Sequence, residues 1–139
     1  MDARSSASSL CILVVDDNQI CRNITARCFR ELGYKAQQAE NGAEALGNFS
    51  TDIELVVTDI EMPVMNGYQL ANKIHEKNPS TPVIAMTSLS AGQLAKQQAQ
   101  EFIDVVDKPV TKAKCKKILE RAGLTKPRPG HDERLLRAV

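Results

Sequence analysis

The sequence contains no tryptophan and few other aromatic residues, with three Phe and two Tyr among 139 positions. Its core must therefore be built mainly from aliphatic side chains. It also lacks any apolar run close to the ~20 residues that a membrane-spanning helix requires. The apolar run after the polar first nine residues is too short for the core of a signal peptide. We therefore expect a cytoplasmic domain with no membrane insertion of this segment.

The cysteines lack the spacing of a zinc site. The four are Cys11, Cys21, Cys28 and Cys115, with no Cys-x-x-Cys pair and no histidine near them in the sequence. We interpret Cys11 and Cys28 as small core residues. A reduced, cytosolic compartment fits this cysteine usage best.

The chain also lacks a large charge of either sign. Its net charge of +1 predicts no direct binding of nucleic acid. Residues 1–111 carry 9 Lys/Arg against 14 Asp/Glu, whereas residues 112–139 carry 9 against 3, so an acidic body precedes a basic end. The length fits one domain. We expect a flexible leader over 1–9, the domain over 10–123 and a Pro-rich basic linker or tail over 124–139.

Short apolar strands alternate with helices five times along the chain. The expected strands are 10–15, 34–39, 54–58, 82–87 and 103–107, and the expected helices are 18–32, 43–50, 67–77, 90–101 and 111–122. This alternation predicts an α/β, flavodoxin-like domain with helices on both faces of a five-stranded parallel sheet of order 2-1-3-4-5. In the first helix, which Gly33 ends, the stripe predicted to face inward is Ile20, Ile24, Cys28 and Leu32.

Polar residues follow the strands at the sheet edge where such folds bind ligands. Asp16 and Asp17 follow the first strand and Asp59 the third, and the predicted order places these strands side by side. Clustered carboxylates persist when a cation compensates them, and hard oxygen ligands suit Mg²⁺. Thr87 and Lys108 add a hydroxyl and an ammonium at the same edge. Together these groups predict a socket for a phosphoryl group, with the central carboxylate as nucleophile.

Each of these residues, taken singly, also has an ordinary structural explanation. Asp17 could cap the helix that starts at residue 18, and Thr87 could cap the helix that follows it. Lys108 could be a solvated lysine. Four strands are each followed by polar residues, in the order that a phosphoryl site requires. One shared site explains this pattern better than a separate structural role for each residue.

Five stretches carry a pattern found in one known family. They are Ile12–Asn18, Asn41–Leu46, Thr58–Gly67, Pro82–Thr87 and Lys108–Pro109. Together they resemble the receiver domain of two-component response regulators, and the resemblance covers residues 10–122.

The resemblance implies a role for each site residue. Asp59 matches the phospho-acceptor, and Asp16 and Asp17 match the acids that bind Mg²⁺. The metal ligands would include Asp59 itself and the backbone carbonyl of Glu61. Thr87 and Lys108 match the hydroxyl and the cation that engage the phosphoryl group.

The resemblance also implies partners and a signalling surface. The phosphoryl donor would be a phosphohistidine on a histidine kinase or a histidine phosphotransfer domain, with no turnover of an external substrate. Signalling would use the surface of the fourth helix, the last strand and the last helix, which could also form a dimer. Val105 stands where many members have Tyr or Phe, which puts an aromatic switch in doubt. The domain could be a stand-alone regulator or the receiver of a hybrid histidine kinase.

Two other functions are alternatives to phosphoryl acceptance. A phosphatase or phosphotransferase with an Asp nucleophile would need an Asp-x-Asp motif, whereas residues 59–61 read Asp-Ile-Glu and the chain has no room for a cap. A phosphorylation-independent interaction module of receiver fold would usually lack one of the acids, the Thr or the Lys.

Overall fold

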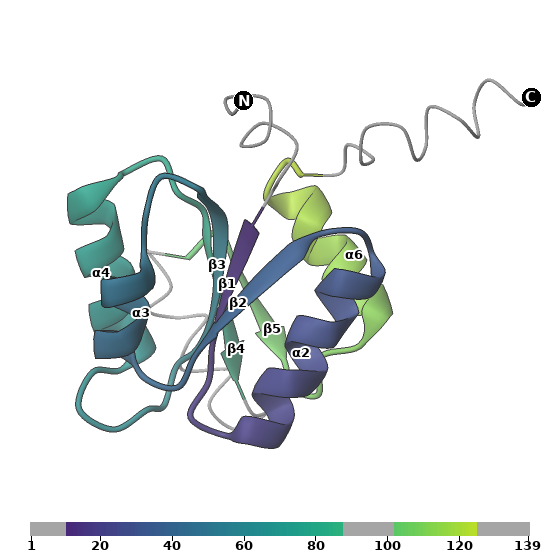
Figure 1. Cartoon of the computed structure of the whole chain (residues 1–139), viewed down its shortest axis with the longest axis horizontal. Coiled ribbons are helices and arrows are strands. Elements are labelled where there is room, and N and C mark those ends of the chain that lie inside the picture. The colour runs from purple at the N-terminus through teal and green to yellow at the C-terminus, as the bar shows by residue number, and fades with distance from the viewer. Residues whose placement is uncertain (1–10, 88–101, 125–139) are drawn as a thin grey trace, which may run out of the picture.

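The structure is a computed structural model, and it describes residues 11–87 and 102–124. Its sheet has five parallel strands in the order β2-β1-β3-β4-β5, as the sequence predicted (Figure 1). The strands are β1 (Cys11–Val15), β2 (Lys35–Ala39), β3 (Ile53–Asp59), β4 (Val83–Thr87) and β5 (Asp104–Asp107). The helices are α2 (Gln19–Glu31), α3 (Gly42–Asn48), α4 (Gly67–Lys77) and α6 (Lys112–Arg121). The helix predicted at 90–101 lies outside the described residues.

The middle of the sheet is buried on both of its faces. Leu13 and Val15 of β1 belong to the apolar cluster that includes residues of α3 and α4. Ile12 and Val14 belong to the second cluster, shared with α2 and α6 on the opposite face (Figure 1). A strand covered on both faces needs apolar residues at consecutive positions, which explains the unbroken apolar sequence of β1.

Side chains at the helix starts satisfy the first free backbone N–H groups. The caps are Asn18 for α2, Asn41 for α3, Asn66 for α4 and Thr111 for α6. Positive φ angles at Gly33 (97°) and Gly123 (77°) follow the ends of α2 and α6, as expected for terminating glycines. No helix in the described part of the chain combines the length and the apolar character needed to cross a membrane.

The inward face of α2 differs from the predicted stripe. Thr25, Ala26 and Phe29 are the buried residues of this helix, whereas Ile20 is 71% exposed and Ile24 is 48% exposed. A stripe of strict four-residue spacing rotates by about 40° at each step around an α-helix. The four predicted positions therefore spread over about 120° of the helix surface. The helix is rotated so that only the later two, Cys28 and Leu32, pack partly against the core.

Candidate functional site

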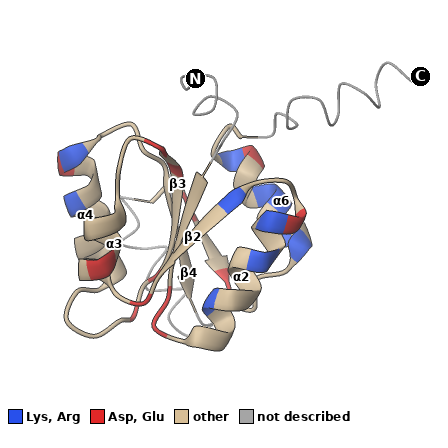
Figure 2. Cartoon of the chain, in the orientation of Figure 1, with Lys and Arg blue, Asp and Glu red and all other residues tan. Residues whose placement is uncertain are grey.

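Three carboxylates meet where β1 and β3 end. Val15 pairs with Thr58 across these two strands, so the next residues, Asp16 and Asp59, emerge side by side. Carboxylate oxygens of Asp16, Asp17 and Asp59 all lie within 4.8 Å of one another. Figure 2 shows acidic residues gathered at this edge of the sheet. The strand order therefore brings together the three acids that the sequence singled out.

Asp16 is held in place by contacts to all of its polar atoms. Its side chain is fully buried. Oδ1 accepts a hydrogen bond from the backbone N–H of Asn18 at 2.9 Å, and Oδ2 lies 2.9 Å from Nζ of Lys108. Its backbone oxygen accepts a hydrogen bond from Nη1 of Arg22 at 2.8 Å. Arg22 was not among the predicted site residues, because its side chain reaches back from the helix and no strand-end pattern marks it.

Asp17 is exposed and does not cap the following helix. Asn18 has that role, since its side-chain oxygen accepts a hydrogen bond from the N–H of Cys21 at 2.9 Å. The capping explanation for Asp17 is therefore wrong. Its carboxylate lies at the open side of the cluster, where it can reach a ligand from solvent.

Lys108 joins two of the carboxylates. Its Nζ lies 2.9 Å from Asp16 Oδ2 and 3.3 Å from Asp59 Oδ2, and its side chain is only 21% exposed. Burial lowers the pKa of Lys108, but the hydrogen bond to Asp16 and the charge of Asp59 outweigh it, so the pKa is raised overall. The interpretation of Lys108 as a solvated lysine is wrong, and its ammonium remains charged at neutral pH.

Asp59 carries the clearest electrostatic perturbation of the site. Burial raises its pKa to about 6, Lys108 opposes this rise, and the charges of Asp16 and Asp17 add to it. Its carboxylate is still mostly ionised at neutral pH. Three carboxylates facing one ammonium leave a net negative cluster of oxygen donors, and this donor set fits Mg²⁺.

Two further predicted residues lie beside this cluster. Thr87 is the last residue of β4 and is buried; its neighbour Met86 pairs with Asp59 across β3 and β4. The backbone oxygen of Thr87 accepts a hydrogen bond from the N–H of Lys108 at 2.7 Å. Glu61 follows Asp59 by two residues, and its side chain is exposed. The phosphoryl-binding role of the Thr87 hydroxyl and the metal-binding role of the Glu61 carbonyl therefore stay predictions.

Gly67 brings the start of α4 against the end of β3. Its N–H donates a hydrogen bond to the oxygen of Ile60 at 2.8 Å. A Cβ at this position would lie 2.6 Å from the backbone oxygen of Asp59 and 2.9 Å from Cα of Ile60, both too close for any side chain. The helix predicted at 67–77 begins at this glycine, as in the structure. The glycine at the first position of a helix was the sequence signal for this close approach.

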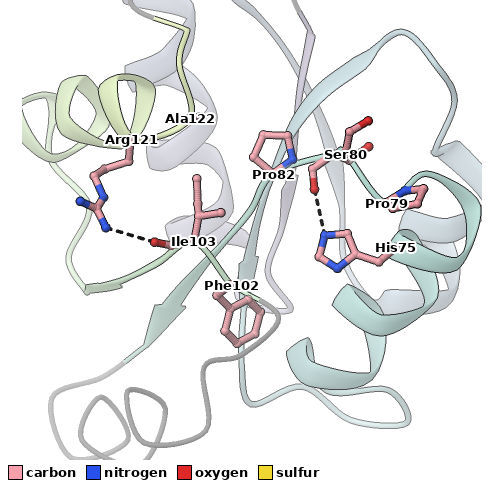
Figure 3. A pocket seen from close by; sticks show the side chains of 9 residues that line it. His75, Pro79, Ser80, Pro82, Phe102, Ile103, Arg121 and Ala122 are labelled. Carbon is pink, nitrogen blue, oxygen red and sulfur yellow. Dashed lines mark hydrogen bonds between the residues drawn. The ribbon is translucent and has the colours of Figure 1, made fainter.

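A separate groove of about 410 Å³ lies at the opposite edge of the sheet (Figure 3). His75 of α4, Phe102 and Arg121 of α6 line it, together with the buried Thr81. The Thr81 hydroxyl has no hydrogen-bond partner among the described residues. None of the predicted site residues lines this groove, so the acidic cluster remains the candidate site.

A five-stranded parallel sheet covered by helices on both faces, with an acidic cluster and a half-buried lysine at its carboxyl edge, defines a doubly wound α/β domain with its candidate site at that edge. The chain belongs to the response regulator receiver domain family, whose sequence model matches residues 12–120. The family resemblance found in the motifs is thereby confirmed.

Curated relatives include sensor kinases. The chain is 34% identical over 111 residues to the sensor histidine kinase RcsC of Escherichia coli, a match that covers 78% of the chain and 12% of RcsC. It is 32% identical over 102 residues to the autoinducer 1 sensor kinase/phosphatase LuxN of Vibrio harveyi, covering 72% of the chain and 12% of LuxN. The chain thus spans about an eighth of the length of these relatives.

Solved structures agree with the family. The response regulator protein TrrA of Thermotoga maritima, solved in complex with Mg²⁺-BeF, is 32% identical with a TM-score of 0.73; the match covers 81% of this chain and 98% of TrrA. The receiver domain of NtrX from Brucella abortus is 25% identical with a TM-score of 0.75, covering 83% and 99%. The flavodoxin-like fold predicted from the sequence is therefore confirmed.

Proposed function

We propose that this domain accepts a phosphoryl group on Asp59 from a phosphohistidine of a histidine kinase or histidine phosphotransfer domain. The observation that carries the proposal is the convergence of three carboxylates within 4.8 Å, with Lys108 against two of them. Membership of the receiver family supports it, as does the complex of the relative TrrA with Mg²⁺-BeF. Asp16, Asp17, Asp59 and the backbone carbonyl of Glu61 would hold Mg²⁺.

The transfer uses the ionised carboxylate of Asp59 as nucleophile. An Asp59 oxygen bonds to phosphorus while the bond from phosphorus to the donor imidazole nitrogen breaks. Bound Mg²⁺ would offset negative charge on the phosphoryl oxygens. Lys108 lies 3.3 Å from the same carboxylate, so its ammonium can stabilise the charge that develops there.

The phosphorylated site changes the charge that Lys108 and Thr87 face. A phosphoryl group adds up to about two negative charges, which attract the ammonium and the hydroxyl. Thr87 is the last residue of β4, and Lys108 directly follows β5. The hydrogen bond from the backbone N–H of Lys108 to the backbone oxygen of Thr87 links the two strands. A movement of Lys108 or Thr87 would therefore reach the proposed signalling and dimerisation surface, which consists of the helix predicted at 90–101, β5 and α6.

Val105 constrains how that signal travels. Its side chain is 9% exposed and belongs to the same apolar cluster as Phe102, beside the ring pair of Tyr68 and Phe102 at 5.4 Å. A valine that is already buried has no large ring to move between exposed and buried positions. The signal in this domain therefore does not depend on an aromatic side chain at position 105.

Phosphorylation by a small phosphodonor tests the proposal. The protein is incubated with acetyl phosphate and Mg²⁺, and its intact mass is followed over minutes. We expect a gain of one phosphoryl group that is absent in Asp59→Asn and when EDTA replaces Mg²⁺. Asp52→Asn, which changes an exposed acid just before β3, should be phosphorylated like the wild type.

The remaining outcomes separate the other functions. No mass gain together with no Mg²⁺ binding would favour an interaction module that works without phosphorylation. Repeated hydrolysis of a general phosphoester would favour an enzyme. A mass gain that persists in Asp59→Asn would place the modification elsewhere and reject Asp59 as the acceptor.

A further inference from the structure

Arg22 ties the start of α2 to both β2 and the end of β1. Its Nη1 donates a hydrogen bond to the backbone oxygen of Asp16 at 2.8 Å, and its Nε donates one to Oε1 of Gln38 at 3.1 Å. Arg22 belongs to α2, whereas Gln38 belongs to the edge strand β2. The half-buried guanidinium is therefore held between the edge strand and the segment that carries two of the three clustered acids.

The oxygen that Arg22 binds lies in the peptide unit that joins Asp16 to Asp17. Val15 is the last residue of β1 and the last one paired with β2, so this oxygen lies beyond the strand ladder. Asp16 is fully buried, and a buried carbonyl requires a hydrogen-bond partner, which Arg22 supplies. Because a peptide unit is planar, a contact that holds its oxygen also fixes the direction in which the chain continues to Asp17.

Asp17 is the member of the acidic cluster whose side chain has the least support. The Asp16 carboxylate is held by Asn18 and Lys108, and the Asp59 carboxylate is held by Lys108. The Asp17 side chain is exposed and has no hydrogen bond or ion pair to any described residue. Repulsion from the two neighbouring carboxylates favours orientations that point away from them. The placement of the Asp17 backbone therefore decides how readily its carboxylate reaches a shared cation.

We propose that Arg22 is a positioning residue for the metal site: its hydrogen bond to the Asp16 oxygen places the carboxylate of Asp17 where it can reach the Mg²⁺ ion that the acidic cluster would hold. Gln38 supports this role, because it holds the guanidinium from the opposite side. This inference rests on the proposed function and adds to it a residue that acts through the backbone of the site.

The charge of Arg22 and its hydrogen bonds have opposite effects on a bound cation. A guanidinium beside the cluster repels Mg²⁺, so the loss of its charge alone would tighten metal binding. The loss of a positioning contact would weaken metal binding, because part of the binding energy would go into ordering Asp17. The direction of the change in Mg²⁺ affinity therefore separates a positioning role from an electrostatic one.

Titration of the full chain with Mg²⁺ by isothermal calorimetry measures this direction. Arg22→Met removes all donors of the side chain and should weaken Mg²⁺ binding by about 10-fold, at the low end of the loss expected when an outer support of a metal site is removed. Gln38→Met removes only the support of the guanidinium and should give a smaller loss in the same direction. Arg27→Met is the matched control, because Arg27 is an exposed arginine of the same helix. Its Mg²⁺ affinity should stay within about twofold of the wild type, since an exposed charge is largely screened at ordinary salt.

A second measurement needs no metal. The backbone amide of Asp17 belongs to the peptide unit that Arg22 holds, so its NMR signal in nitrogen-15-labelled protein in EDTA reports on that contact directly. We expect this signal to shift or broaden in Arg22→Met and Gln38→Met and to stay in place in Arg27→Met. An unchanged signal in the first two variants would overturn the proposal. Melting curves in EDTA check that each variant folds, and Gln38→Met decides the question by both measurements if Arg22→Met does not fold.

The outcomes keep this inference apart from the proposed function. Mg²⁺ binding that is unchanged or tighter in the folded Arg22 and Gln38 variants would overturn the positioning role, while acetyl phosphate could still phosphorylate the wild type. A wild type that binds Mg²⁺ but gains no phosphoryl group would reject the proposed function, and weaker Mg²⁺ binding in the two variants would still support positioning. A wild type that binds no Mg²⁺ would overturn both.

Discussion

Replacing Asp59 with Asn should make the metal-free protein more stable at neutral pH. The pKa of Asp59 is about 6 in the folded protein, compared with an ordinary value of 3.8. A shift of this size corresponds to about 3 kcal/mol at about 1.4 kcal/mol per pKa unit. Asn has nearly the same shape and carries no charge, so it removes the cost of holding an ionised group there.

Lys108 reduces the expected gain. In the variant its ammonium loses the contact of 3.3 Å to Asp59 but keeps the contact of 2.9 Å to Asp16. We therefore expect Asp59→Asn to raise the free energy of unfolding by about 1–2 kcal/mol, which is less than the pKa shift of Asp59 alone would give.

The sign of the pH dependence follows from the direction of the shift. A carboxyl whose folded pKa is raised binds its proton more tightly in the folded protein than in the unfolded chain. Asp59 therefore costs no stability below pH 3.8, an increasing amount between pH 3.8 and about 6, and a constant amount above that range. The advantage of the variant should shrink to roughly half when the pH falls from 7.5 to 5.

Urea denaturation in EDTA at pH 7.5 and pH 5 measures both effects. Asp52→Asn is the matched control, because this exposed acid should change the free energy of unfolding by less than about 0.5 kcal/mol. Added Mg²⁺ should then stabilise the wild type more than the Asp59→Asn variant. A wild type at least as stable as the variant in EDTA at pH 7.5 would refute the argument that burial and the neighbouring acids raise this pKa.

Other substitutions test the packing that holds the site. Gly67→Ala should destabilise the protein by about 1–3 kcal/mol in urea denaturation, because its Cβ would lie 2.6 Å from a backbone oxygen at the end of β3; Gly47→Ala on α3, where nothing lies within 4 Å, should instead stabilise by about 0.5–1 kcal/mol. Lys108→Met should cost about 3 kcal/mol or more in thermal unfolding, since it leaves Asp16 buried without its cation, and an unchanged melting temperature would contradict this role. Asn18→Ala should cost about 1 kcal/mol through loss of the α2 cap, and a change below about 0.3 kcal/mol would count against that cap.

Local patterns in the sequence were sufficient for much of the fold. The alternation of short apolar strands and helices predicted a parallel sheet covered on both faces, and the structure confirms it, with β1 inside the sheet. The range predicted for α4, residues 67–77, also matches the structure. These features depend on residues close in the sequence, where period and glycine position are direct signals.

The inward face of α2 could not be predicted in the same way. Ile20 and Ile24 are apolar and regularly spaced, yet they are exposed, and Thr25 is buried instead. The orientation of a helix on a sheet is set by the surface beneath it, and the sequence of the helix does not contain that surface.

The candidate site was also predictable from the sequence only in part. The sequence by itself determined which residues end the strands, and with the strand order it predicted that Asp16, Asp17 and Asp59 would converge. Only the tertiary structure decided that Lys108 lies against Asp16 and Asp59, and that Arg22 reaches back to the backbone oxygen of Asp16. Such contacts join separate elements of the fold, and they depend on how helices and loops pack over the sheet rather than on any local pattern.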